Sequence, residues 1–208
     1  MLWGIFVVAL LGDVVADPLA EAAARFRALN SYQVTVRSTL ADGERQVIRY
    51  FYRKPGWVRM EFSRPHGGLV LIYDPGARKV RLWPFGLNQA LALTLAPDNP
   101  LVRSRSGQRI DRSDVGALLA NLVDLRTGGS ISPLGTTEIA ARPAACFDII
   151  GGAGSAVAGV HRYRVWLAQE TLFPLRVESF DAAGGLIETV DMADAEIDVV
   201  FPERFFAP

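Results

Sequence analysis

Apolar and polar residues alternate along most of this chain, a pattern typical of half-buried antiparallel strands. In one such strand Val58, Met60 and Phe62 share a face, while charged and aromatic residues occupy the other. Turn signals such as Asp42-Gly43 and Pro55-Gly56 separate the alternating segments. The pattern predicts strands at 32–40, 44–53, 57–62, 69–73, 79–83, 136–150 and 162–168, and a closing ribbon at 172–206. The segment 87–95 is ambiguous between strand and helix.

Two segments have helical periodicity instead. Asp17 and Pro18 predict a helix start, with a capping carboxylate followed by proline at the first helical position. A second helix is expected to begin after Ser113-Asp114 and to end at Gly128-Gly129. Its apolar stripe consists of Val115, Leu118, Leu119, Leu122 and Leu125. A single helix between two blocks of strands usually covers one open face of the sheet, so a mainly β (α+β) fold is predicted.

The N-terminal sixteen residues, MLWGIFVVALLGDVVA, predict a signal peptide. The apolar run at 2–11 is too short for the ~20 residues that span a bilayer. Small residues at Val14 and Ala16 favour cleavage before Asp17, which leaves residues 17–208 as one domain. A basic segment is missing, so three alternatives remain: an uncleaved N-terminal anchor, a true start further upstream, or a buried first element of the fold.

Charge and hydrophobicity narrow the range of partners. The chain has 22 basic and 22 acidic side chains, so no long-range field attracts nucleic acid or an anionic bilayer. Hydrophobic residues make up 50% of the sequence, at the top of the globular range. This share is more than an ordinary core requires, so some of the apolar surface is expected to line a cavity.

The sequence shows no grouping that predicts catalysis, a cofactor or a metal. His66 and His161 stand beside turn glycines, and neither a GxSxG nor an HExxH motif occurs. The lone Cys146 lies in a strand-like segment and is expected to be buried. The glycine-rich run 151–159 lacks the lysine of a phosphate-binding loop and is interpreted as a flexible hairpin loop. The acidic residues near the C-terminus are interpreted as a solvated strand face rather than a cation site: Asp191, Asp194, Glu196 and Asp198.

From about residue 21 to 89 the order of features resembles the periplasmic outer-membrane lipoprotein carrier (LolA-like) superfamily. The matching parts are the amphipathic first helix and the segments ALNSYQVTV, KPGWVRMEFSRP and LWPFGLNQA. The closing segment LFPLRVESFDAAGGLIETV, with the later FPERFF, is similar to the last strands of that family. The region 97–145 matches least.

The resemblance implies an incomplete antiparallel β-barrel of about eleven strands, with amphipathic helices as a lid over an apolar cavity for acyl chains. It also implies that a basic residue before the proline of the KPG turn holds the lid closed, a position that Lys54 occupies here. The family uses arginine there, and lysine lacks its planar fork of donors. Unlike the lipid-anchored receptor of this superfamily, the chain has no cysteine near its N-terminus, which favours the carrier.

We therefore expect a periplasmic, monomeric carrier that shields acyl chains of a lipoprotein or another amphiphilic lipid between an inner-membrane donor and an outer-membrane acceptor. The predicted cavity residues are Val58, Met60, Phe62, Leu71, Tyr73 and Leu82, and the predicted lid residues are Phe26, Leu118, Leu119 and Leu122. Ordinary core packing is the alternative for each, because both roles give the same periodicity. The alternative function is a periplasmic sensor that binds lipoprotein or glycolipid and regulates a membrane protein; a lipid-acting enzyme ranks lowest.

Overall fold

The computed structural model describes residues 17–87, 91–104 and 107–207. The predicted signal peptide and part of the ambiguous segment 87–95 lie outside these ranges. The helices are α1 (Pro18–Ala28) and α2 (Val115–Arg126), with two short 3-10 turns, η1 (Pro100–Val102) and η2 (Ile110–Arg112). The strands are β1 (Ser31–Leu40), β2 (Arg45–Arg53), β3 (Trp57–Arg64), β4 (Val70–Asp74), β5 (Lys79–Trp83), β6 (Leu93–Leu95), β7 (Ser130–Ile139), β8 (Arg142–Ile150), β9 (Arg162–Ala168), β10 (Pro174–Phe180), β11 (Leu186–Asp191) and β12 (Glu196–Ile197).

All described strands belong to one antiparallel sheet, in the order β6-β5-β4-β3-β2-β1-β11-β10-β9-β8-β7, with β12 paired to β1. From β1 to β6 and from β7 to β11 each strand pairs with the next one in sequence, and β11 pairs with β1 to join the two halves at the centre. β6 and β7 are the two outer strands and do not pair with each other, so the sheet stays open. The predicted incomplete barrel with a helical lid is confirmed; the twelfth strand, β12, has only two residues.

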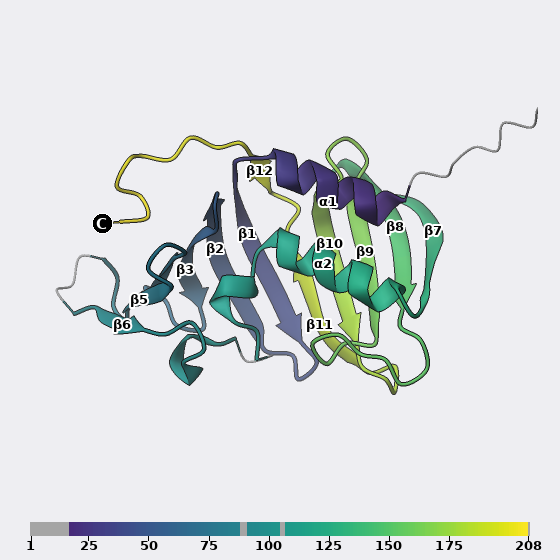
Figure 1. Ribbon diagram of the computed structural model, residues 1–208, viewed down its shortest axis with the longest axis horizontal. Helices are drawn as coiled ribbons and strands as arrows, with labels where there is room; N and C mark the ends of the chain where they lie inside the picture. Colours follow the sequence, from purple (N-terminus) through teal and green to yellow (C-terminus); the bar gives the residue numbers. More distant parts are fainter. Residues whose placement is uncertain (1–16, 88–90, 105–106, 208) are drawn as a thin grey trace, which may run out of the picture.

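The two helices lie on the same face of the sheet, across β1 and β8 to β11 (Figure 1). Both begin as the sequence predicts: the Asp17 side chain accepts a hydrogen bond from the Leu19 amide, and the Asp114 side chain accepts one from the Ala117 amide. We call the face under the helices the inner face. Among the described residues, neither helix has the length and apolar character that a membrane crossing requires.

Strand register brings apolar side chains together on the inner face. Val34 stands opposite Tyr50, and Met60 stands opposite both Tyr50 and Leu71. Directly opposed residues of antiparallel strands point to the same side of a sheet. The result is one apolar cluster that runs across the sheet from β5 to β8 and includes the buried residues of both helices.

The C-terminal segment differs from the sequence expectation. FPERFF is not a strand; it forms turns at the end of a tail that runs from β12 towards β3 and β5 (Figure 1). Its aromatic residues pack on the outer face of β2 to β5. Phe206 is fully buried there in a second apolar cluster with Phe51, Ile72 and Trp83. The Arg53 guanidinium lies 4.8 Å from the Phe206 ring centroid, a cation–π contact. The alternation of apolar and polar residues could not predict this packing, because the tail is not a strand and its contacts with the sheet follow no regular spacing in sequence.

Two further details lie outside what periodicity predicts. Segment 130–139 belongs to the sheet as β7, and a turn at Ala140 and Ala141, both with positive φ, joins it to β8. The glycine-rich loop between β8 and β9 packs tightly against the end of α2: a Cβ on Gly152 would lie 2.1 Å from the Gly128 carbonyl oxygen. Those glycines are therefore needed for close backbone approach. Cys146 is buried in β8, and burial raises the pKa of its thiol.

Candidate functional site

The inner face of β3 to β5 carries the six residues predicted to line a cavity. Val58, Leu71, Tyr73 and Leu82 are buried, and Met60 and Phe62 are half-buried. All six belong to the same apolar cluster as the lid residues, together with Val102 of η1 and Ile110 of η2. The structure thus gathers these residues on one surface and covers it with the chain's own segments. Contact with a cargo remains a prediction for each of them.

Helix α2 is fixed to the sheet by a group of tyrosines on the inner face. The Tyr32 hydroxyl accepts a hydrogen bond from the Val115 amide at 3.2 Å, and the hydroxyls of Tyr50 and Ser113 are 3.0 Å apart. Tyr32 stacks between Tyr50 and Tyr52, with ring centroids 5.8 and 5.2 Å away. Burial raises the pKa of Tyr52 to about 12 and those of Tyr32 and Tyr50 further, so these hydroxyls stay protonated as hydrogen-bond donors.

The predicted lid residues take two different positions on the helices. Leu119 and Leu122 of α2 are fully buried against the sheet, whereas Leu118 is half-buried. Phe26 of α1 lies over the tyrosines, with its ring centroid 5.6 Å from that of Tyr52. Phe26 also touches α2 where Gly116 leaves room: a Cβ there would lie 2.4 Å from the Phe26 ring. The two helices therefore pack directly against each other at this point.

A cavity of about 380 Å³ lies beneath α1. Its apolar wall includes Phe26, Leu29, Leu119 and Phe173, and its other lining residues are Ala22, Arg25, Ala28, Val115, Glu170, Thr171, Leu172, Pro174, Ile197 and Asp198. Small-molecule sites have volumes of roughly 300–1,000 Å³ and mostly apolar walls. Of the ten predicted cavity and lid residues, Phe26 and Leu119 line this cavity. The loop between β9 and β10, which supplies Leu172 and Phe173, was not identified from the sequence because its spacing has no regular period.

Three polar contacts hold α1 in place. The Lys54 ammonium group donates a hydrogen bond to the Arg27 carbonyl oxygen at the end of α1, and the Arg25 guanidinium donates one to the Glu170 carbonyl oxygen. At the other end of α1, Asp17 forms an ion pair with Arg126 of α2, with 2.5 Å between Oδ2 and Nη1. Burial alone would raise the pKa of Asp17, but hydrogen bonds from Arg126 and from backbone amides bring it below its usual value.

The acidic residues at the end of the chain bind other parts of the protein. Asp194 accepts a hydrogen bond from the Thr35 amide and pairs with Arg37, while Asp198 accepts one from the Asn30 amide. Asp191 pairs with Arg176. Within the described residues, no group of three or more histidine, cysteine or acidic side chains is arranged to hold a metal ion.

His161 contacts the Ser155 carbonyl oxygen through Nδ1 at 2.6 Å.

Comparison with known proteins rests on structure. No protein-family model matches the chain, and no curated protein matches its sequence. Among solved structures it is similar to an uncharacterized conserved protein from Thermus thermophilus, with a TM-score of 0.58, 11% identity, and coverage of 92% of this chain and 94% of that chain. It is also similar to the lipoprotein LppX of Mycobacterium tuberculosis, with a TM-score of 0.55, 14% identity, and coverage of 89% and 97%.

A third similar structure is the MucA/MucB complex of Pseudomonas aeruginosa, with a TM-score of 0.50 and 17% identity. That match covers 90% of this chain but only 61% of the matched chain. At such identities these likenesses establish the fold. Together with the open antiparallel sheet and its two covering helices, they define the class by fold: the chain shares the fold of these proteins, the incomplete antiparallel barrel that its resemblance to LolA-like carriers implies.

Proposed function

We propose that this protein is a periplasmic carrier that binds the acyl chains of a lipoprotein or another amphiphile on the inner face of its sheet. The observation that carries the proposal is the cavity under α1, whose apolar wall is continuous with the cluster on the inner face. Burial of hydrocarbon stabilises a bound lipid by about 0.8 kcal/mol per CH₂. Transfer to the outer membrane is the step that such a binding site would serve.

Displacement of the helices is the proposed route of cargo entry. In the closed state α1 and α2 occupy the inner face, so a long acyl chain needs space that the helices now fill. Movement of α1 requires breaking the polar contacts at Lys54, Arg25 and Asp17, all of which lie on half-buried or exposed parts of the surface. Surface contacts of this kind contribute little stability each, which suits a lid that opens.

Native mass spectrometry of the protein purified from membrane-containing cells tests the proposal. Co-purified lipid, released under denaturing conditions and identified by its mass, is the expected result. A titration with a fluorescent fatty acid should then show saturable binding to delipidated protein. Protein that carries no lipid and binds no acyl probe would rule out the carrier function.

A second candidate function is regulatory, with a membrane protein as the partner. The similarity to MucB, which forms a complex with MucA, favours it. In that case the native mass spectrum should show a stoichiometric protein partner without lipid. The two functions therefore give different masses in the same measurement.

A further inference from the structure

A row of polar side chains crosses the otherwise apolar inner face under α2. Glu188 of β11 stands opposite Ser179 of β10, and Ser179 stands opposite Tyr163 of β9. On its other side Glu188 stands opposite Leu40 of β1. Because opposed residues share a face, these side chains lie side by side among the cluster that the helices cover.

Ser38 of β1 adds a polar group without a partner. Its side chain is 4% exposed, and its hydroxyl makes no hydrogen bond to any described residue. Ser38 stands opposite Val190, two positions along β11 from Glu188, and its hydroxyl lowers the pKa of the Glu188 carboxyl against the effect of burial. A buried hydroxyl without a hydrogen bond costs free energy in the folded protein. A ligand group that forms a hydrogen bond with it removes this cost, which strengthens binding.

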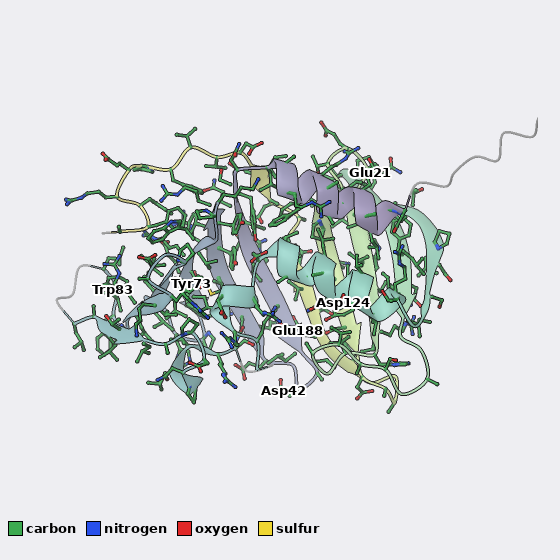
Figure 2. All side chains as sticks on the ribbon, viewed as in Figure 1. Glu21, Asp42, Tyr73, Trp83, Asp124 and Glu188 are labelled. Carbon is green, nitrogen blue, oxygen red and sulfur yellow. The ribbon has the colours of Figure 1, made fainter. Side chains whose placement is uncertain are left out.

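The Glu188 carboxyl also has no ion-pair partner among the described residues. None of the ion pairs among the described residues involves it. Figure 2 shows Glu188 beside α2, on the side of the sheet that the helix covers. Burial raises the pKa of this carboxyl, and the Ser38 hydroxyl opposes the shift. When ionised, the group can only accept hydrogen bonds.

Helix α2 supplies the other wall of this polar row. Asn121 lies on α2 within reach of the Tyr163 hydroxyl, where it partly offsets the effect of burial on the Tyr163 pKa. The nearby Ser179 hydroxyl makes one long hydrogen bond, 3.4 Å, to the Glu188 carbonyl oxygen. A carboxylate with two little-used hydroxyls on an apolar surface is complementary to a ligand with a positive, donor-rich head and a hydrocarbon tail.

We propose that Glu188, Ser38 and Ser179 form a subsite for the protonated amine of a cationic amphiphile whose chain lies along the inner face. The proposal rests on the proposed function, because the hydrocarbon part needs the same apolar surface. The subsite is separate from the cavity under α1, because none of its three residues lines that cavity.

Calorimetric titration with three twelve-carbon probes tests the subsite: dodecylamine, dodecanol and dodecyl sulfate, each below its micelle concentration. The wild-type protein should bind dodecylamine about 10- to 100-fold more tightly than dodecanol, as expected for one hydrogen-bonded charge pair. Dodecyl sulfate should bind more weakly than dodecanol. n-Butylamine, which has the amine but a short chain, should show no saturable binding; tight binding of butylamine would overturn the amphiphile in favour of a free amine.

Variants test which residues cause the preference for dodecylamine over dodecanol. Glu188→Gln should bind dodecylamine and dodecanol equally, and Ser38→Ala should reduce the preference. Glu178→Gln is the matched control, because Glu178 neighbours Ser179 but pairs with Arg164 on the outer face, and it should keep the full preference. Circular dichroism confirms that each variant is folded. Equal binding of all probes by the wild type, or an unchanged preference in Glu188→Gln, overturns the subsite alone. Absence of binding by all three twelve-carbon probes overturns the carrier function as well.

Discussion

At the scale of single residues, Gly116 decides how closely the two helices approach. A Cβ at this position would lie 2.4 Å from the Phe26 ring and 2.8 Å from Asp114 Oδ1, so a methyl group forces α1 away from α2. The helix itself would prefer alanine to glycine. Contact between helices therefore overrides local propensity here.

Gly116→Ala should lower the free energy of unfolding by about 1–3 kcal/mol, the usual cost of overpacking. In a Phe26→Leu background the same change should cost about 1 kcal/mol less, since the clash with the ring is relieved while the close approach to Asp114 Oδ1 remains. Urea unfolding of the four proteins in this double-mutant cycle measures both effects. Equal changes in the two backgrounds would show that Phe26 does not limit the approach of the helices.

Glu188 gives a second residue-scale prediction, on the pH dependence of stability. Burial raises the folded-state pKa of this carboxyl above its ordinary value of 4.5, so the folded protein favours the protonated form. The contribution of this group to stability is therefore highest below pH 4.5, where the carboxyl is protonated, and it falls as the pH rises through the folded-state pKa and the buried group ionises. Glu188→Gln removes the cost of a buried charge, so at pH 7 it should raise Tm by about 2–4 °C, which corresponds to roughly 1 kcal/mol. At pH 4 the difference should shrink.

Calorimetric melting at both pH values checks this expectation. Glu178→Gln, which removes a carboxylate paired with Arg164, should not raise Tm at pH 7. A Tm difference for Glu188→Gln that stays the same at pH 4 and pH 7 would contradict the assignment of a raised pKa.

At the scale of elements, the proposed opening of the inner face depends on how α1 is attached. Lys54 follows β2 and reaches the last turn of α1, where carbonyl groups have no partner within the helix. This geometry suits the lid-closing role that the family resemblance implies, and the role itself stays a prediction. A single ammonium group replaces the planar fork that arginine would supply.

Lys54→Met keeps most of the side-chain volume but removes the donor, so α1 should detach more readily. The rate of uptake of a fluorescent fatty acid should rise by about fivefold or more, the factor that corresponds to a contact of roughly 1 kcal/mol. Lys79→Met, on an exposed position of β5, is the control and should leave the rate unchanged. Equal rates in both variants would show that Lys54 does not restrain the lid.

At the scale of the whole molecule, the sheet separates two apolar surfaces. The inner one lies under the helices, and the outer one is covered by the C-terminal segment, where Phe206 meets Phe51, Trp57 and Phe205. Arg59 ties this segment down by donating a hydrogen bond to the Phe205 carbonyl oxygen at 2.6 Å. The tail thus completes the core on the side away from the proposed cargo.

Phe206→Ala should therefore lower the free energy of unfolding by about 3–5 kcal/mol, as expected for a fully buried phenylalanine. Its affinity for an acyl probe, measured at a temperature where the variant is folded, should match that of the wild type. Phe85→Ala is the control: Phe85 is 72% exposed, and its loss should change stability by less than about 0.5 kcal/mol. Denaturant unfolding and probe titration on the same samples separate the two surfaces.

The sequence alone determined the helices, most strands and the apolar inner face of this protein. Asp17 and Asp114 cap helices by local hydrogen bonds, and alternation such as Val58, Met60 and Phe62 fixes a face within one strand. These signals depend on residues that are close together in the chain, so the sequence predicts the helix starts and the strand faces without knowledge of the tertiary structure.

Only the tertiary structure decided what covers each face. The cavity under α1 depends on Phe173 of a distant loop, the outer surface on Phe206, and the unpaired Glu188 on register across four strands. Each of these arises from contacts between segments far apart in the chain. Because burial and partner choice are set by such contacts, a period of two along one strand cannot distinguish a cargo-binding surface from an ordinary core.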